Sequence, residues 1–473
     1  DEDFLGSLDM NNIESFEILK DAASSAIYGS RGGNGVILIT TKSGKEGDLR
    51  VSYNMLTGYK SAHQSDAYHT SVAEAVALEQ EATGTLSDRT RVKQLIGVDN
   101  NWQDIIFDGG IFTDHSLSLG GGTESTKYNA AFNYLNDEGV LLSDNFERTS
   151  VNLKIDHKLN KRLTVGLSAN PSFTTQKRFD GSTHDILRQP SWLPVYLDEN
   201  TIQFVNRFRD GGKYANAKIG DYAIQRMFDD YDLVAGAPSM GSGTDISNTS
   251  NTNPAAKILE RDRVIQRNKF LGSIYAKYKI ASGLTFRSKA SMNYQYRRET
   301  RYQGVLSSRN GASASRLDST VTKTMRWVVD NTLTYTKEIG KHEVNAVLGT
   351  SFENRKQTWN TIQGSVFQDD IDPTINKAAS ITNQDAYEWK RTLLSFFGRL
   401  NYAYDNKYLA SFSYRRDGSS VFGPNTKYGN FAAASLGWNA AKEDFLKDSE
   451  VINRLKFRVS YGVTGNNDFR TGD

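Results

Sequence analysis

Residues 26–44, AIYGSRGGNGVILITTKSG, place five glycines around one arginine, a composition that could hold a phosphate group. A glycine-rich loop binds phosphate when it leads from a strand into a helix, because the free N–H groups at the start of the helix converge on the anion. Here the order is reversed. The preceding residues predict a helix from Asn12 to Gly29, and the following residues predict a strand over 35–41. The carboxyl end of a helix repels phosphate, so we interpret these glycines as turn residues.

The residues that usually carry catalysis or bind metal form no convincing site. The chain has no cysteine, and its six histidines form no pair at zinc-ligand spacing. The acidic clusters FDDYD (228–232) and QDDIDP (368–373) lack the spacing of a calcium loop, so solvated loop charge is the simpler interpretation. No Ser/His or Asp/His motif indicates a nucleophile with its base. The sequence therefore predicts no enzyme, no metal and no cofactor.

The composition indicates a strand-rich protein. Among 473 residues, aromatic residues make up 11%, while only 7 are proline. The 57 basic and 55 acidic residues nearly balance, which excludes a nucleic-acid binder that must neutralise many phosphates. The sequence contains no run of eighteen apolar residues and opens without an export signal. If the protein crosses a membrane, we expect it to cross with strands.

From Leu49 onward, apolar and polar residues alternate in segments of about nine to fifteen residues, such as TKYNAAFNYLN and LTFRSKASMNYQYRR. This length suits a tilted transmembrane strand better than a strand of a soluble sandwich. The connections between the segments alternate between short ones (121–125, 159–162, 281–283, 337–341, 405–406) and long ones (61–112, 137–147, 178–266, 299–322, 357–389, 417–429). Outer-membrane β-barrels have short periplasmic turns and long extracellular loops, so this alternation predicts such a barrel.

Mid-strand Lys, Arg and Asp residues on the polar face imply that this face lines a wet lumen, because a lipid-facing Arg or Lys costs about 2–4 kcal/mol. We count roughly thirteen barrel strands. Bacterial single-chain barrels close with an even number. We therefore expect the chain to be a fragment of a longer protein.

The segment NNIESFEILKDAASSAIYGSRGGNGVILITTKSG closely resembles the end of the plug domain in TonB-dependent outer-membrane transporters of the SusC/RagA type of Bacteroidota. Matching positions include Asp21, Tyr28, Gly29, Arg31, Asn34 and Gly35. The chain departs from the common Arg-Ala-Ala-Asn pattern at Gly32 and Gly33. The segments YNAAFNYLNDEGV, KYLASFSYRRDGSSVFG and LKFRVSYGVTGNND resemble barrel segments of the same family.

The resemblance implies an all-β membrane protein of the Gram-negative outer membrane: a large antiparallel barrel, of 22 strands in the complete family fold, with a small α/β plug domain in its lumen. Residues 1–47 would be the carboxyl-terminal part of the plug, and residues 48–473 the amino-terminal part of the barrel. The implied partners are a SusD-like surface lipoprotein, the TonB–ExbB–ExbD complex and outer-membrane lipid. The resemblance leaves open whether transporter–lipoprotein pairs dimerise.

Within the expected plug, Arg31 is the residue best suited to gating. An arginine in a glycine turn can tie the plug to inward carboxylates of the barrel by a hydrogen-bonded ion pair. The alternative is that Arg31 only braces the carbonyl groups of its own turn. Tyr28 is a packing residue in this interpretation. The resemblance makes Asp21, Tyr28, Gly29, Arg31, Gly32, Gly33, Asn34 and Gly35 the plug signature.

The expected cargo residues are aromatic side chains in the long loops: Trp192, Tyr196, Trp359, Tyr387 and Trp389. A sugar ring can stack on such side chains. For Trp359 and Trp389 we favour the alternative of an aromatic girdle at the membrane surface, and Trp192 could also contact the lipoprotein. The implied function is TonB-dependent import of an oligosaccharide or a peptide. The competing function is a surface adhesin or docking protein that works through its long loops.

Overall fold

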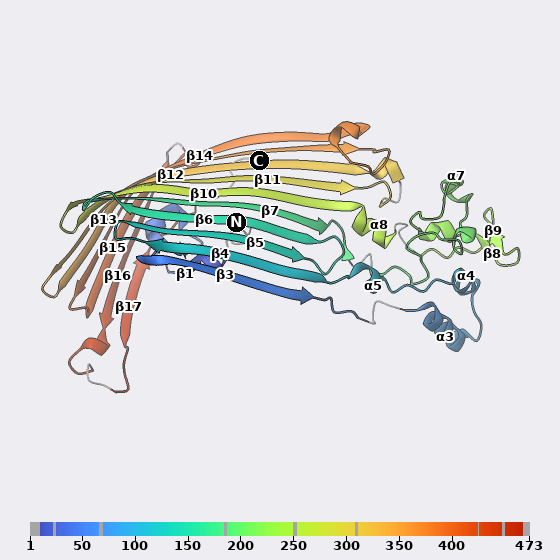
Figure 1. The fold of residues 1–473 in the computed structure, drawn as a ribbon, viewed down its shortest axis with the longest axis horizontal. Coiled ribbons are helices and arrows are strands. Elements are labelled where there is room, and N and C mark those ends of the chain that lie inside the picture. Colours follow the sequence, from blue (N-terminus) through green and yellow to red (C-terminus); the bar gives the residue numbers. More distant parts are fainter. Residues whose placement is uncertain are drawn as a thin grey trace.

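Thirteen strands form one antiparallel sheet in which every strand pairs with its neighbours in chain order (Figure 1). The computed structural model describes residues 10–21, 25–65, 70–183, 187–248, 253–307, 311–423, 425–446 and 450–466. The number of strands confirms the sequence prediction. The strands are β3 (Gly47–Lys60), β4 (Gly110–Gly122), β5 (Thr126–Glu138), β6 (Asn145–Lys158), β7 (Leu163–Phe179), β10 (Arg261–Ala281), β11 (Leu284–Gln303), β12 (Arg316–Ile339), β13 (His342–Ser365), β14 (Ser380–Tyr404), β15 (Tyr408–Ser419), β16 (Tyr428–Asn439) and β17 (Lys456–Gly462).

The alternation of residue types gives this sheet two different faces, because successive side chains of a strand point to opposite sides. One face exposes large apolar side chains, among them Ile274, Leu348, Leu400 and Phe412. The other face carries polar side chains at mid-strand and contacts the N-terminal segment. We call these the outer face and the inner face. Among the described residues, no helix has the length and apolar character to cross a lipid bilayer.

The connections at one end of the sheet are tight turns, as predicted. Between β14 and β15, Asp405 and Asn406 both have positive φ (53° and 52°), which is the backbone of a type I′ hairpin turn. We call this the turn end and the opposite end the loop end. The connection between β16 and β17, residues 440–455, departs from the predicted alternation: it lies at the turn end but is long and contains η8 (Ala440–Lys442).

Several predicted long loops are shorter than expected, because the strands continue into them. Residues 357–389 were expected to be a loop, yet β13 reaches Ser365 and β14 begins at Ser380. Toward the loop end of these two strands, both faces carry many polar side chains, so the alternation that marks a half-apolar strand fades. The backbone pairing between β13 and β14 nevertheless continues to Ser365 and Ser380.

The connections β3–β4 and β7–β10 fold together beyond the loop end of the sheet (Figure 1). They contain α3 (Val72–Thr83), α4 (Asp88–Ile96), α5 (Trp102–Ile106), η4 (Ile202–Phe204), α7 (Arg209–Gly212), η5 (Gln225–Phe228), β8 (Tyr231–Asp232), β9 (Ala237–Pro238) and α8 (Pro254–Leu259). A hydrophobic core that includes Val92, Leu193 and Phe228 joins the two connections. We call this unit the loop-end cap.

The predicted helix from Asn12 to Gly29 is wrong over its first half. Residues 10–12 form the short helix η1 (Met10–Asn12), and β1 (Ile13–Leu19) then pairs antiparallel with β2 (Val36–Thr41). An isolated helix of this length is marginal in water. The structure instead pairs Phe16 with Ile39 in a two-stranded sheet, in which Phe16 stays 46% exposed. Residues 22–24 of the predicted helix lie outside the described ranges. In the described part of the second half, Ser25 is α-helical and η2 (Ala26–Arg31) is a 3₁₀ helix.

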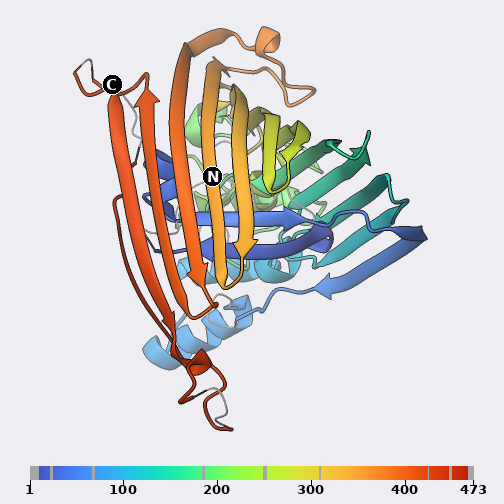
Figure 2. The ribbon, with the colours of Figure 1, turned by 90° about the vertical axis from the view of Figure 1, so that its left-hand side faces the viewer.

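The predicted strand after the glycine loop is confirmed as β2. Strands β1 and β2 form a two-stranded sheet of their own, separate from the large sheet. They lie on the concave side of the large sheet, whose strands curve around them (Figure 2). The element η2 packs against β14, β15 and β16.

Candidate functional site

The glycine turn of η2 meets the inner face of β15 at very close range. Gly29 has a φ of +57°, a conformation that side chains rarely adopt, and a Cβ atom there would lie 2.4 Å from Asp417 Oδ2. The next residue, Ser30, donates two hydrogen bonds to that same oxygen, from its backbone N–H (2.8 Å) and its hydroxyl (2.7 Å). A glycine at position 29 therefore allows the carboxylate of Asp417 to dock on the backbone of η2.

Arg415, on the same face of β15, completes this contact. Its Nε donates to Asp417 Oδ1 (2.6 Å), its Nη1 to the Ile27 carbonyl (3.0 Å) and its Nη2 to the hydroxyl of Ser395 (2.8 Å). Both charged side chains are almost fully buried, and each is paired and hydrogen-bonded, which is the condition for a buried charge to be tolerated. Arg415 therefore braces the Ile27 carbonyl in the turn, which is the alternative role that the sequence suggests for Arg31.

Arg31 makes a second contact with the sheet. Its Nη1 donates to Glu353 Oε2 on β13 (2.8 Å), and the same carboxylate accepts two hydrogen bonds from Arg326 on β12 (2.9 and 2.8 Å). Burial lowers the pKa of the Arg31 guanidinium, and the Glu353 carboxylate opposes that shift. Arginine nevertheless stays charged in proteins, so a charged guanidinium faces this carboxylate.

Two further signature residues lie against the sheet. Asp21 pairs with Arg458 on β17 (2.8 Å). Tyr28 is half-buried, and burial raises the pKa of its hydroxyl while the nearby charges of Arg399 and Arg31 lower it. This placement is compatible with packing as the role of Tyr28.

The remaining glycines of the signature shape the backbone. Gly33 N–H donates to the carbonyl of Gly465 (3.0 Å), and a Cβ at Gly33 would come within 2.6 Å of that oxygen. Gly35 has a φ of +82°, and its N–H closes a turn onto the Gly32 carbonyl (3.1 Å). Asn34 is exposed between them. The glycine turn is therefore contacted by the loop after β17 in addition to the sheet.

Trp192 does not have the accessible position expected of a cargo residue. Its side chain is only 2% exposed and packs edge-on against Phe228 in the core of the loop-end cap (5.9 Å between ring centroids). Tyr196 is 46% exposed and packs against Tyr222, with ring centroids 4.9 Å apart. Of these two cargo candidates, only Tyr196 offers a surface to a ligand.

Trp359, Tyr387 and Trp389 lie on strands rather than in loops, and on the inner face rather than in an outer girdle. Trp359 is six positions from Glu353 on β13 with no register shift between them, so both point to the same face. Trp359 is the register partner of Tyr387, and their rings stack (5.3 Å, 30°). The loop position expected for the three residues is therefore wrong, as is the girdle position expected for Trp359 and Trp389, because the strands continue past the expected end of the membrane span.

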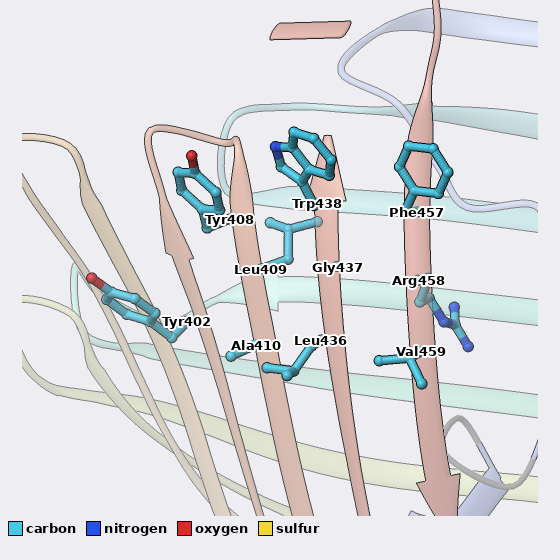
Figure 3. Close-up of a pocket in the computed structure, with 10 residues that line it drawn as sticks. All are labelled: Tyr402, Tyr408, Leu409, Ala410, Leu436, Gly437, Trp438, Phe457, Arg458 and Val459. Atoms are coloured by element: carbon cyan, nitrogen blue, oxygen red, sulfur yellow. The ribbon is translucent and has the colours of Figure 1, made fainter. Parts of the chain in front are cut away.

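An aromatic cluster does occupy the outer face, at the turn end of β14–β17. Tyr402, Tyr408, Trp438 and Phe457 border a shallow apolar pocket there (Figure 3). The Tyr408 hydroxyl and the indole N–H of Trp438 donate to Glu443 Oε1 (2.7 and 3.1 Å). Aromatic rings with a polar edge suit a membrane–water interface.

In the acidic loop clusters, Asp229 and Asp370 anchor backbone, whereas Asp369 and Asp372 face solvent as expected. Asp229 is buried and accepts hydrogen bonds from the N–H groups of Ile246 and Ser247 (both 2.8 Å). Asp370 accepts from the hydroxyl of Tyr302 (2.7 Å) and from Val305 N–H (2.6 Å). In the described part of the chain, no group of three or more His, Asp or Glu side chains is arranged to hold a metal ion.

The residues that sequence reasoning missed are the wall partners Arg326, Glu353, Arg415 and Asp417. Each follows the inward parity of its strand, so the signal for a lumenal position was present. Their choice of partner in η2 depends on how the segment folds back onto the sheet. A single sequence does not contain that information.

Comparison with known proteins identifies the family, although no family model matches the chain. The chain is 31% identical over 472 residues to the TonB-dependent receptor SusC of Bacteroides thetaiotaomicron, covering 96% of this chain and 43% of the relative. It is 30% identical over 459 residues to the TonB-dependent receptor P3 of Formosa agariphila, covering 96% of this chain and 42% of the relative. The chain thus spans less than half the length of these curated relatives.

Solved structures agree on the fold. A structure of the RagAB peptide importer in the open-open state matches with a TM-score of 0.74 at 20% identity, covering 99% of this chain and 52% of that one. The unliganded ferric citrate transporter FecA matches with a TM-score of 0.52 at 9% identity, covering 93% and 49%. With its large antiparallel sheet and its N-terminal segment held on the inner face, the chain belongs to the SusC/RagA-type TonB-dependent receptors, β-barrel proteins of the outer membrane.

Proposed function

We propose that the full-length receptor imports a nutrient, an oligosaccharide or a peptide, across the outer membrane by a TonB-dependent mechanism. Residues 1–47 would be the end of the plug domain, and residues 48–473 would be barrel strands around it. One observation carries this proposal: buried side-chain pairs, and not strand pairing, hold the N-terminal segment against the inner face. A plug held in this way can be released without unravelling the barrel.

The Arg415–Ile27, Asp21–Arg458 and Gly33–Gly465 contacts would have to break for the plug to move, and so would two contacts to buried carboxylates of the wall. The first joins Ser30 to Asp417, and the second joins Arg31 to Glu353. After release, Arg415 can still pair with Asp417, and Arg326 can still pair with Glu353. Each buried carboxylate therefore keeps a partner on the wall, which lowers the cost of opening compared with leaving a buried charge alone.

The proposed partners are the TonB–ExbB–ExbD complex, which would pull on the plug, and a SusD-like surface lipoprotein, which would capture the cargo at the loop end. The RagAB structures are described as a peptide importer. That description supports peptide as one cargo class, whereas aromatic side chains with exposed rings, such as Tyr196 and Tyr387, support oligosaccharide as the other. Whether transporter–lipoprotein pairs dimerise stays open.

Uptake assays test this proposal. Cells that express the full-length receptor should accumulate labelled cargo, and deletion of tonB should abolish the accumulation while leaving the amount of receptor in the outer membrane unchanged. Uptake that continues at the same rate without TonB would overturn the import mechanism.

The second candidate function is a surface adhesin or docking protein. The loop-end cap favours it, because Val234 is 98% exposed and Met240 is also exposed near the β8–β9 hairpin. Removing residues 231–244 should reduce attachment of cells or of a partner in this case, with no dependence on TonB. TonB-dependent uptake without any effect on attachment would exclude it.

A further inference from the structure

The continuous register of β10–β14 assembles one row of inner-face side chains across five strands. Arg267 pairs with Arg297, Arg297 with Thr322, Thr322 with Trp359, and Trp359 with Tyr387. Register partners on neighbouring strands share a face and lie about 5 Å apart. Basic side chains therefore stand at one end of this row and aromatic rings at the other, separated by the short side chain of a threonine.

The rows on either side repeat this arrangement. Toward the turn end, Lys269, Gln295, Thr324, Gln357 and Trp389 form the next row. We call the inner-face residues of these and the adjoining rows the arginine–aromatic patch. Its members are Arg263, Arg267, Lys269, Gln295, Arg297, Glu299, Arg301, Asp318, Thr320, Thr322, Thr324, Arg326, Glu353, Arg355, Gln357, Trp359, Thr361, Asp385, Tyr387, Trp389 and Arg391.

The basic end of the patch has more positive charge than its own carboxylate can neutralise. Glu299 accepts from Arg263 (2.7 Å) and Arg301 (3.0 Å), and it also pairs with Arg297. Three guanidinium groups thus share one carboxylate. Arg301 remains 44% exposed, so its charge is accessible from the lumen side.

The aromatic end combines ring faces with further cations. The guanidinium groups of Arg355 and Arg391 lie 5.2 and 5.6 Å from the centre of the Trp389 ring. Tyr387 stacks on Trp359 and is 49% exposed. Stacked, partly exposed rings offer a flat apolar surface with fixed orientation.

Across the whole patch, eight basic side chains face four acidic ones. Two of the four carboxylates, Glu299 and Glu353, are each bound by several arginines of the chain. The face as a whole is therefore positive, and a cluster of one sign inside a walled lumen concentrates ligands of the opposite sign.

We propose that the arginine–aromatic patch is a cargo-binding surface for oligosaccharides that carry carboxylate or sulfate groups. The anionic groups bind the arginines of β10 and β11, while sugar rings stack on the aromatic side chains of β13 and β14. The Thr and Gln side chains between them serve the sugar hydroxyls. This inference rests on the proposed import function and names the cargo class of that function.

The backbone of the patch favours a sugar over a peptide. Peptides commonly bind by adding a strand to an exposed sheet edge. In the patch, β11, β12 and β13 each pair with a neighbour on both sides, so the backbone groups are already used by the sheet. Over these three strands recognition must come from side chains, and those present suit charged, hydroxyl-rich rings. The edge of β14 over residues 380–391 pairs only with β13 and stays open.

Binding measurements on the purified full-length receptor in detergent test the inference. The probes are tetragalacturonate, the neutral sugar maltotetraose and hexaglutamate. The variants Arg297→Gln and Arg301→Gln should each weaken tetragalacturonate binding about tenfold, the loss expected for one charge-assisted hydrogen bond. Arg298→Gln is the matched control, because Arg298 is the next residue on β11 and lies on the outer face. Trp389→Leu should also weaken the binding of tetragalacturonate.

The inference would be overturned by equal affinity for maltotetraose and tetragalacturonate, by an equal loss of affinity in Arg297→Gln and Arg298→Gln, or by no binding of tetragalacturonate to the folded receptor. Tighter binding of hexaglutamate than of tetragalacturonate would also overturn it and would reassign the patch to acidic peptides. Failure of the import proposal looks different. In that case uptake continues without TonB, whatever the purified receptor binds.

Discussion

Ser30 and Asp417, which are 387 positions apart in the chain, share two hydrogen bonds to a single carboxylate oxygen. The contact exists because Gly29 leaves no Cβ between them and because Arg415 neutralises the other oxygen of the carboxylate. The tie between the N-terminal segment and the sheet thus depends on one glycine and one buried ion pair, and both can be tested separately.

Asp417→Ala should loosen η2 strongly. The change removes the oxygen that accepts both hydrogen bonds from Ser30 and leaves Arg415 buried without its carboxylate, a loss of about 3–5 kcal/mol for a broken buried pair. Native-state hydrogen exchange at the amide of Ser30 measures the local free energy of opening. Asp405→Ala is the control, since Asp405 pairs with Lys341 in an exposed turn and should leave the exchange of η2 unchanged. Equal exchange at Ser30 in the Asp417→Ala and wild-type proteins would contradict this assignment.

Gly29→Ala should displace η2 from β15. A residue with a side chain is strained at a φ of +57°, and its Cβ would also overlap Asp417 and Arg415. Strain at such a position costs about 1–3 kcal/mol, and the overlap adds to it. Gly236→Ala separates the two effects, because Gly236 has a φ of +67° with no atom within 4 Å of the added Cβ. Limited proteolysis near residue 30 should increase in the first variant only.

Arg31→Gln and Glu353→Gln should show coupled effects in a double-mutant cycle. We expect an interaction energy of about 0.5–3 kcal/mol for contacting residues, measured from the opening of η2 by hydrogen exchange. Glu353→Gln should be the more damaging single change, because Glu353 also binds Arg326. Arg31→Gln leaves that pair on the wall intact. If the effects of the two substitutions are additive, the Arg31–Glu353 pair does not help to hold η2 against the sheet.

Substitutions of Trp192 test whether this side chain belongs to the hydrophobic core of the loop-end cap rather than to a cargo-binding surface. Trp192→Ala should destabilise the cap by about 3–5 kcal/mol, because it empties the centre of a hydrophobic core. Trp192→Phe should cost much less, since the indole N–H is buried and has no hydrogen-bond partner among the described residues. Increased hydrogen exchange confined to α4 and the 192–231 segment would agree with this. Loss of cargo binding in both variants with an intact cap would instead restore the role of Trp192 as a contact residue.

The junction between the cap and the sheet should depend on pH through Glu260. Burial, and then the neighbouring Asp370, raise the pKa of this carboxyl above its ordinary value of 4.5, while the Tyr222 hydroxyl that donates to it (3.2 Å) opposes the shift. A raised pKa in the folded state means that the stabilising contribution is complete below pH 4.5 and is lost as the pH rises through the folded-state pKa. Protection of α8 from hydrogen exchange, corrected for intrinsic rates, should therefore be greater at pH 5 than at pH 8. Glu260→Gln should remove this dependence, and an unchanged dependence would locate it elsewhere.

Most features that could be predicted from the sequence follow from strand parity, the rule that alternate residues of a strand point to opposite faces of the sheet. Alternation predicted a polar face toward the lumen and roughly thirteen strands, because a half-apolar strand must turn its polar residues away from lipid. The same parity holds for Glu353 and Asp417, which the sequence analysis did not single out. The same rule applied further along β13 and β14 would have placed Trp359 and Trp389 on the inner face. The outer face of β13 and β14 also becomes polar in this region, so the sequence predicts that both strands end before Trp359 and Trp389.

Other features needed information beyond parity. The capping box of Ser71 and Glu74 and the glycine C-cap at Gly84 mark a helix in the sequence, so α3 could have been predicted. The stretch around Phe16 has spacing that suits a helix or a strand, and only its pairing with β2 decides the outcome. The partner of Ser30 could not be predicted, because its contact with Asp417 depends on the folding of the whole chain.

The ladder between β12 and β13 runs without a bulge from His342 to Ser365. If these strands were to slip by one residue during insertion, Glu353 would turn toward lipid and Leu348 toward water. A misassembled wall would then lack the carboxylate that receives Arg31. The contact of Arg31 with the wall therefore depends on the correct register of β12 and β13.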